Sequence, residues 1–212
     1  MMKKALILGT YNDAPYHPFA GVDRALKDLL SPDFDVTLID DPARLEETER
    51  GGYSLLVSYL DAFDKPFPDA PAQAVCRFVR DGGGLLCLHN GISLQTNEAM
   101  YRLIGGRFLR HPRQTVLRFL PAAEGFLKDL PGFAISEEPY QFELYDKALT
   151  PLLRYEYEGA SYPGGWCRAE GAGRVVFLTP GHSAEAFRVP EYLDMIARSA
   201  RWLTEEKPPK GC

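Results

Sequence analysis

The sequence lacks the features of several large protein classes. No stretch approaches the roughly 20 apolar residues that a helix needs to span a bilayer, and the start, MMKKALILGT, is too short for a signal peptide. No basic cluster opposes the net charge of −5, so we expect neither nucleic-acid nor anionic-membrane binding, which both need a basic face. The four cysteines are scattered without a C-x-x-C pair, which indicates reduced thiols in a cytoplasmic protein.

The length and composition fit a single globular domain. With 212 residues and 45% hydrophobic content, the chain can bury a sizeable core. Short apolar runs alternate with segments of helical period, and this order predicts an α/β fold with a doubly wound, mostly parallel sheet. We expect one domain over 1–204 and a flexible tail at 205–212.

The expected elements follow from hydrophobic period and turn residues. Strands are predicted at 5–8, 34–39, 55–59, 85–88, 115–119, 152–157, 165–168 and 174–179, and helices at about 19–30, 44–49, 71–80, 97–103 and 190–203. The turn EGAG at 170–173 joins the last two strands into a C-terminal antiparallel hairpin. We expect irregular chain at 107–112 and 136–142.

The stretch DGGGLLCLHNG, residues 81–91, carries the strongest local signal. Its glycines favour a tight turn after a helix, and the apolar run that follows predicts a buried strand. This strand ends at His89. Because open α/β sheets bind ligands at the carboxyl edge of their parallel strands, we expect His89 to be presented there and not buried. Cys87 lies inside the strand, and a buried thiol is usually inert, so we do not expect thiol catalysis.

All four histidines fall at predicted strand ends or in loops: His17, His89, His111 and His182. Loops that follow parallel strands share one rim of a sheet, so at least three of them can converge there. With Glu138 they form a candidate set for a divalent metal such as zinc, or for acid/base chemistry. Taken singly, a loop histidine is more often a surface residue or a cap, and no H-E-x-x-H spacing supports a metal.

The acidic pair Glu137 and Glu138 has two interpretations. It is either a solvated acidic turn or the source of one functional carboxylate. The second interpretation is favoured because Tyr140 follows at once and offers both a ring face and a hydroxyl to a polyol.

Four segments resemble the ThuA-like proteins associated with trehalose utilisation. They are GGGLLCLH at 82–89, YRLIGGRFLRHP at 101–112, EEPY at 137–140 and GAGRVVFLTPGH at 171–182, with WCR at 166–168 as a fifth match. The resemblance implies the fold of class I glutamine amidotransferases, a flavodoxin-like three-layer sandwich. It also implies that His89, His111, Glu138, Tyr140 and His182 are the rim residues.

The chain departs from the family and from the amidotransferases at specific positions. Glu137 stands where the family usually has aspartate, and the tryptophan that often follows the LH motif is missing from 92–95. His89 occupies the corner where amidotransferases carry their nucleophilic cysteine. We therefore expect no glutamine hydrolysis through a thioester.

Three functional hypotheses remain open. In the first, a sugar hydrolase or isomerase uses His89 and His182 as acid/base groups or metal ligands, and Glu138 orients one of them or accepts a substrate hydroxyl. The residues expected to bind a sugar or polyol are Asp13, His17, Asn90, His111 and Tyr140. The second hypothesis is a non-catalytic sugar-binding or regulatory protein on the same scaffold. In the third, the histidine rim is an interface for a partner, which includes assembly as a homo-oligomer.

Overall fold

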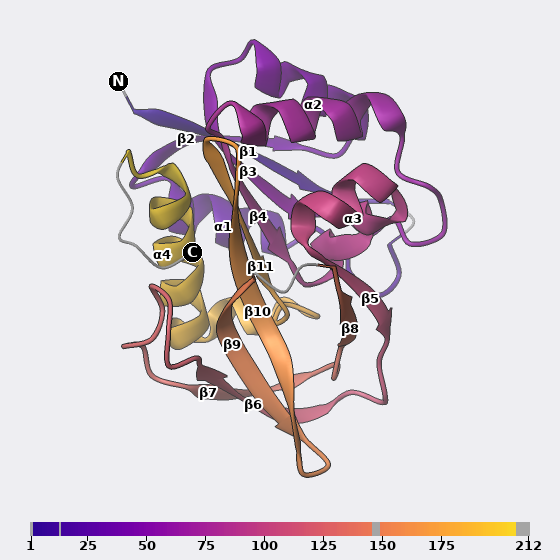
Figure 1. Cartoon of the computed structure of the whole chain (residues 1–212), viewed down its shortest axis with the longest axis vertical. Coiled ribbons are helices and arrows are strands. Elements are labelled where there is room, and N and C mark those ends of the chain that lie inside the picture. The colour runs from indigo at the N-terminus through magenta and orange to yellow at the C-terminus, as the bar shows by residue number, and fades with distance from the viewer. Residues whose placement is uncertain (1, 13, 146–148, 207–212) are drawn as a thin grey trace.

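In the computed structural model, residues 2–12, 14–145 and 149–206 are described. They form a main sheet of nine strands: β1 (Lys3–Gly9), β2 (Phe34–Ile39), β3 (Tyr53–Tyr59), β4 (Gly84–Leu88), β6 (Thr115–Pro121), β7 (Phe133–Glu137), β9 (Thr150–Tyr157), β10 (Ala160–Glu170) and β11 (Gly173–Leu178). The spatial order is β2-β1-β3-β4-β11-β10-β9-β6-β7. Its first five strands run parallel, and the other four continue the sheet antiparallel (Figure 1).

Helices cover both faces of this sheet. The helices are α1 (Val22–Leu30), α2 (Asp69–Arg80), α3 (Glu98–Ile104) and α4 (Pro190–Thr204), with 3₁₀ segments at Pro42–Glu49, His89–Thr96 and Ala186–Arg188. Buried side chains of α1 and α4 join one core cluster, and those of α2 and α3 join another on the opposite face (Figure 1). The predicted three-layer α/β sandwich with a C-terminal antiparallel hairpin is therefore confirmed.

Two segments expected to be irregular form strands. Gly106–Arg110 (β5) pairs antiparallel with Gln141–Leu144 (β8) in a separate two-stranded sheet, and part of 136–142 belongs to β7 and β8. Both β5 and β8 are half-exposed to exposed over most of their length. They carry no continuous apolar run, so hydrophobic period gives little sign of them.

Among the element boundaries that differ from those predicted, two have a clear local reason. β10 begins at Ala160, ahead of the expected 165–168, because Glu158 and Gly159 adopt left-handed φ angles of 49° and 77° and turn the chain into a β9–β10 hairpin. α2 begins at Asp69, so Pro71 lies within the first turn, where a missing N–H is tolerated. Of the predicted tail, 207–212 lies outside the described residues.

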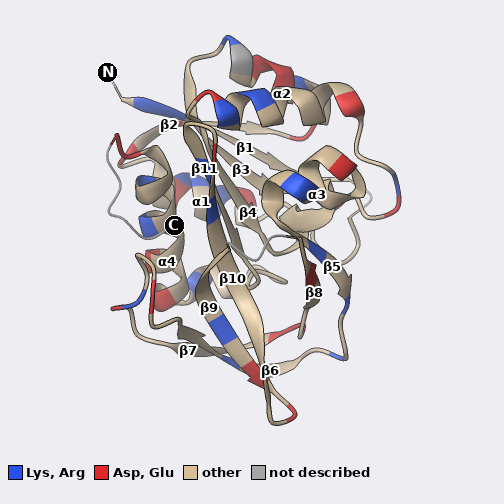
Figure 2. Cartoon of the chain, viewed as in Figure 1, with Lys and Arg blue, Asp and Glu red and all other residues tan. Residues whose placement is uncertain are grey.

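The surface carries both signs of charge. Figure 2 shows acidic and basic residues side by side on α2 and α4, and on α4 Arg198 lies 3.2 Å from Asp194. Exposed pairs of this kind contribute little to stability, so the two core clusters must provide most of it. Within the described residues, no helix is both long enough and apolar enough to cross a membrane.

The parallel half of the sheet determines where the polar loops meet. β1, β3, β4 and β11 all end at the same edge, and the chain leaves them through loops that carry His17, Asp61, His89 and His182 respectively. Residues far apart in the sequence are thereby brought to one rim.

Candidate functional site

Four side chains converge on one point at this rim. We call His17, His89, Glu138 and His182 the His/Glu cluster; one ligand atom from each lies within 4.8 Å of the others. His17 Nε2 is 3.2 Å from His89 Nε2 and 3.2 Å from His182 Nδ1. Glu138 Oε2 lies 3.3 Å from each of the other two ring nitrogens and 3.8 Å from His17 Nε2.

His89 is buried, which corrects the expectation that it is presented at the surface. Its exposed fraction is 0%, because the chain continues as a buried 3₁₀ segment and the Tyr140 ring packs 4.4 Å from the imidazole. Its φ of 45° lies in the left-handed region, which is unusual for a residue with a side chain. Nδ1 donates to the Thr179 carbonyl at 2.7 Å, and this bond directs Nε2 into the cluster.

His17 is also held in one orientation. The sequence analysis grouped it with the other histidines as a candidate metal or acid/base residue and expected it to bind substrate. Its Nδ1 bonds to Asp61 Oδ2 at 2.8 Å, which leaves Nε2 facing the cluster. Burial lowers the pKa of His17, but the hydrogen bond to Asp61 and the nearby Glu138 carboxylate outweigh it and raise this pKa to about 9. Burial has the opposite effect on Glu138 and raises its pKa, but the close contacts with His17, His182 and His89 outweigh it, so the pKa of Glu138 is lowered.

The donor atoms of the cluster fit a divalent metal ion. Nδ1 of His17 donates to Asp61, and Nδ1 of His89 donates to the Thr179 carbonyl. In the neutral rings both Nε2 atoms therefore carry a lone pair, and because these lone pairs face each other, a proton or a cation must lie between them. Donors around a tetrahedral zinc ion at 2.0–2.1 Å are about 3.3 Å apart. Five of the six donor pairs of the cluster are separated by 3.2, 3.3 or 3.8 Å, and the sixth, between His89 and His182, lies within 4.8 Å. Glu138 Oε2 is buried without a hydrogen bond, as a ligand oxygen would be.

Asp61 and the Thr179 carbonyl occupy the outer positions typical of a metal site. Metal-binding histidines nearly always donate their other ring N–H to a carboxylate or a carbonyl, which fixes the tautomer. Sequence reasoning missed Asp61. The rule that selected the histidines, a polar residue just after a parallel strand, would have found it, because Asp61 closely follows β3.

Glu137 is the member of the acidic pair that sequence reasoning did not choose for the site. Its exposed fraction is 0%, and its Oε2 accepts the backbone N–H groups of Gly181 at 2.7 Å and of His182 at 3.1 Å. Its Oε1 accepts the N–H of Glu138 at 2.9 Å. Glu137 therefore positions two residues of the cluster through their backbones.

The remaining candidates lie at different depths. Asn90 is fully buried, donates to the Tyr59 carbonyl at 2.8 Å, and is not among the residues that border the cavity beside the cluster. His111 joins the site from β5, since its Nε2 is 3.6 Å from Glu138 Oε1. The Tyr140 ring packs against the rings of His89 and His111 and has an exposed fraction of 1%. Asp13 falls outside the described residues.

A cavity of about 450 Å³ opens directly onto the cluster. His17, Asp61 and Glu138 border it from the side of the cluster. His111, which follows β5, and Tyr140, which precedes β8, border it from the side of the small sheet. A ligand in this cavity can therefore reach an ion held by the cluster.

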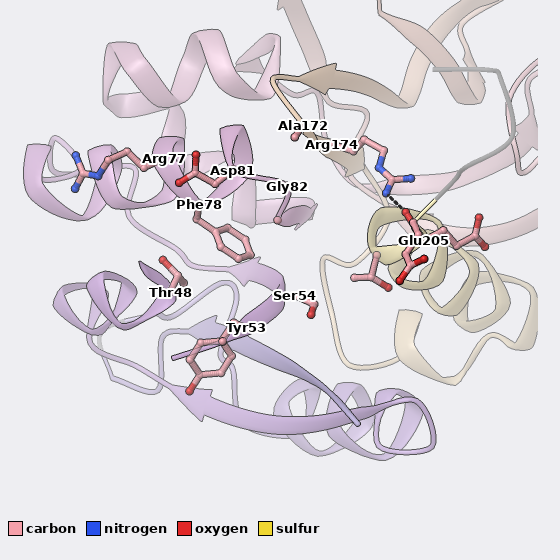
Figure 3. A pocket seen from close by; sticks show the side chains of 14 residues that line it. Thr48, Tyr53, Ser54, Arg77, Phe78, Asp81, Gly82, Ala172, Arg174 and Glu205 are labelled. Carbon is pink, nitrogen blue, oxygen red and sulfur yellow. Dashed lines mark hydrogen bonds between the residues drawn. The ribbon is translucent and has the colours of Figure 1, made fainter. Parts of the chain in front are cut away.

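A larger cavity, of about 620 Å³, lies at the opposite edge of the sheet (Figure 3). Tyr53, Gly83 and Arg174, at or near the starts of three strands, border it, and none of its lining residues is a histidine. Arg174 donates to the carbonyl of Trp202 and to that of Glu205, the second of which is drawn in Figure 3, and so caps the end of α4. These two bonds give Arg174 a role in the fold.

The cysteines are placed largely as the sequence indicated. Cys87 lies within β4 with an exposed fraction of 0%, and burial raises the pKa of its thiol. Cys76 and Cys87 are free thiols. Cys167 is disulfide-bonded, so the expectation of reduced thiols is wrong at that position, because spacing along the chain does not reveal which sulfurs meet in space.

The Cys87→Ala variant is expected to keep full ligand and metal binding. Removing a buried sulfur should lower the free energy of unfolding by only about 1 kcal/mol, since the cavity left behind is small. Urea unfolding measures the stability change, and metal content measured by elemental analysis reports on the site. A loss of metal comparable to that of a cluster variant would contradict the inert role of this thiol.

Comparisons with known proteins agree with the resemblance. The family model ThuA, described as trehalose utilisation, matches residues 6–203. No curated protein matches significantly. Among solved structures, a protein described as ThuA-like from Parabacteroides merdae ATCC 43184 superposes with a TM-score of 0.78 at 17% identity, covering 99% of this chain and 92% of that one.

Two further solved structures are similar. One is described as ThuA-like and comes from Bacteroides uniformis ATCC 8492, with a TM-score of 0.75, 18% identity, and coverage of 99% of this chain and 94% of that chain. The other is a cytoplasmic protein of Salmonella typhimurium LT2, with a TM-score of 0.64, 17% identity, and coverage of 95% and 100%. At these identities the structures show the fold alone, whereas the family model spans nearly the whole chain. The chain therefore belongs to the ThuA family.

Proposed function

We propose that this protein is a cytoplasmic, metal-assisted enzyme that acts on a sugar derivative bound beside the His/Glu cluster. Membership in a family described as trehalose utilisation supports a carbohydrate-related role. The observation that carries the proposal is the approach of His17 Nε2 to both other ring nitrogens at 3.2 Å, with the Glu138 oxygen alongside.

Each residue of the cluster has a defined part. His17, His89, His182 and Glu138 would hold the ion, and Asp61 and Glu137 would keep them oriented. A divalent ion supplies a Lewis acid for a substrate oxygen and lowers the pKa of bound water. Because coordination requires neutral imidazoles, loading the site would release the proton that His17 otherwise holds.

The cavity residues would bind the sugar. Burial and the nearby Glu138 and Glu137 carboxylates raise the pKa of Tyr140, so its hydroxyl stays protonated and can donate to a substrate oxygen. His111 lies at the edge of the cavity with its Nε2 3.6 Å from Glu138 Oε1, where it can exchange a proton with a bound hydroxyl. Hydrolysis and isomerisation of a sugar both fit these groups.

Elemental analysis of the purified, tag-free protein tests the proposal. We expect about one divalent ion per chain in the wild type and almost none in His89→Ala and His182→Ala. His111→Ala is the matched control, because His111 lies outside the cluster, and it should keep its ion. The same samples are then screened for conversion of sugars.

Two outcomes would count against the proposal. Metal-free wild-type protein from metal-replete medium would contradict a metal site. Stoichiometric metal with every bound sugar returned unchanged would favour a sugar-binding protein over an enzyme.

A further inference from the structure

We infer that the cavity beside the His/Glu cluster takes an uncharged or amino-bearing sugar and rejects the phosphorylated or carboxylated counterpart. This inference rests on the proposed function, because it names the ligand class of the same cavity. Two independent features of the cavity wall support it, its charge and its aromatic rings.

Carboxylates dominate the charge around the cavity. Asp61, Asp64 and Glu138 border it, and no lysine or arginine occurs among its lining residues in the described part of the chain. Glu137 lies fully buried behind them. These four carboxylates outnumber the two positive charges of a divalent ion, whose histidine ligands are neutral. A cleft lined by charges of one sign concentrates their electrostatic potential. An incoming ligand therefore meets a negative potential even when the metal ion is bound.

Aromatic rings form the other wall. Phe63 lies 5.3 Å from Phe108, and Phe108 lies 4.3 Å from Tyr140, both measured between ring centroids. Tyr16, with an exposed fraction of 74%, stands at the edge of the cavity. Ring faces are electron-rich, so they pack against the C–H face of a sugar and attract cations.

Anion sites are built from other groups. Phosphate and carboxylate ligands are usually held by arginine forks or by N–H groups at a helix N-terminus. The lining of this cavity offers carboxylates and ring faces instead, together with two imidazoles that already face carboxylates, His17 toward Asp61 and His111 toward Glu138. A phosphoryl group would therefore meet repulsion from several sides, with only the metal and the His111 ring to attract it.

Titrations of the cobalt(II)-loaded protein, followed by its visible spectrum, test the inference. The ligands are D-glucose, D-glucosamine and D-glucose 6-phosphate, together with inorganic phosphate, which needs no particular sugar shape. We expect glucose 6-phosphate and inorganic phosphate each to bind at least about tenfold more weakly than whichever of glucose and glucosamine binds more tightly. Glucose 6-phosphate that binds as tightly as glucose or glucosamine would overturn the inference.

The Asp64→Asn variant tests the role of charge even if neither sugar binds. Asp64 is exposed at the cavity, so its neutralisation should leave the fold intact and raise the affinity for inorganic phosphate by about fivefold. Asp28→Asn, the same charge change on the exposed face of α1, should leave phosphate affinity unchanged. Equal phosphate affinity in wild type and Asp64→Asn would overturn the inference.

Failure of the proposed function would be distinguishable. If the protein binds no cobalt, the metal site is contradicted, and the same ligands are titrated by calorimetry into the metal-free protein. A preference for glucose 6-phosphate or phosphate there would overturn the inference separately, and a preference for glucose or glucosamine would support it.

Discussion

The Asp61→Ala variant is expected to bind a divalent ion about 10- to 100-fold more weakly than the wild type, with its fold intact. Asp61 lies outside the His/Glu cluster and contacts it through His17, whose Nδ1 is 2.8 Å from Asp61 Oδ2. Losing such an outer partner frees the ring to rotate and to change tautomer, and in metalloproteins this costs about 10- to 100-fold in metal affinity. His17→Ala removes the ligand itself and should cost more than about 100-fold.

Competition with a chelator of known affinity measures these losses. Asp64→Ala is the matched control, because Asp64 lies three residues along the same loop and borders the same cavity, but forms no ion pair with His17 among the described contacts. It should bind the ion within about twofold of the wild type. Equal affinities in Asp61→Ala and Asp64→Ala would show that the contact with His17 does not support a metal site.

The sequence predicted the site wherever the topology of the parallel sheet alone determines position. His17, His89 and His182 follow strands that end at one edge, so alternation of strands and helices was enough to bring them together. Glu138 comes from the antiparallel half, and the family resemblance, not the strand pattern, placed it at the rim. Its approach to within 3.3 Å of His89 and of His182 could not be read from spacing.

What the sequence missed depends on contacts between distant segments. His89 looked exposed because a polar residue after a strand usually marks a surface loop, but the segment that follows it folds back as buried 3₁₀ helix. β5 and β8 are short and largely exposed, and their pairing with each other gives no local hydrophobic signal. Glu137 was indistinguishable from a solvated acidic residue until its three backbone donors were known.

Glu137→Ala should destabilise the protein by about 3–5 kcal/mol. The buried carboxylate accepts three backbone N–H groups, two of them from the loop that carries His182. Alanine leaves these donors without a partner, and each unsatisfied buried donor costs about 1–3 kcal/mol. Glu137→Gln should cost less, about 2 kcal/mol, because an amide offers one oxygen, and its NH₂ group must then face at least one backbone donor.

The neighbouring glutamate provides the control that separates folding from metal binding. Among the described contacts, the Glu138 carboxylate pairs with the His17, His89 and His182 rings and with no backbone N–H group, so Glu138→Gln should destabilise the metal-free protein by less than Glu137→Ala, about 1–2 kcal/mol, and still abolish metal binding. Urea unfolding in the presence of a chelator is the measurement, because a bound ion would add its own stabilisation. If the two glutamates have these different roles, Glu137→Ala loses more stability than Glu138→Gln, and Glu138→Gln loses the ion. Equal unfolding midpoints for Glu137→Ala and Glu138→Gln would mean that Glu137 does not hold the loop in place.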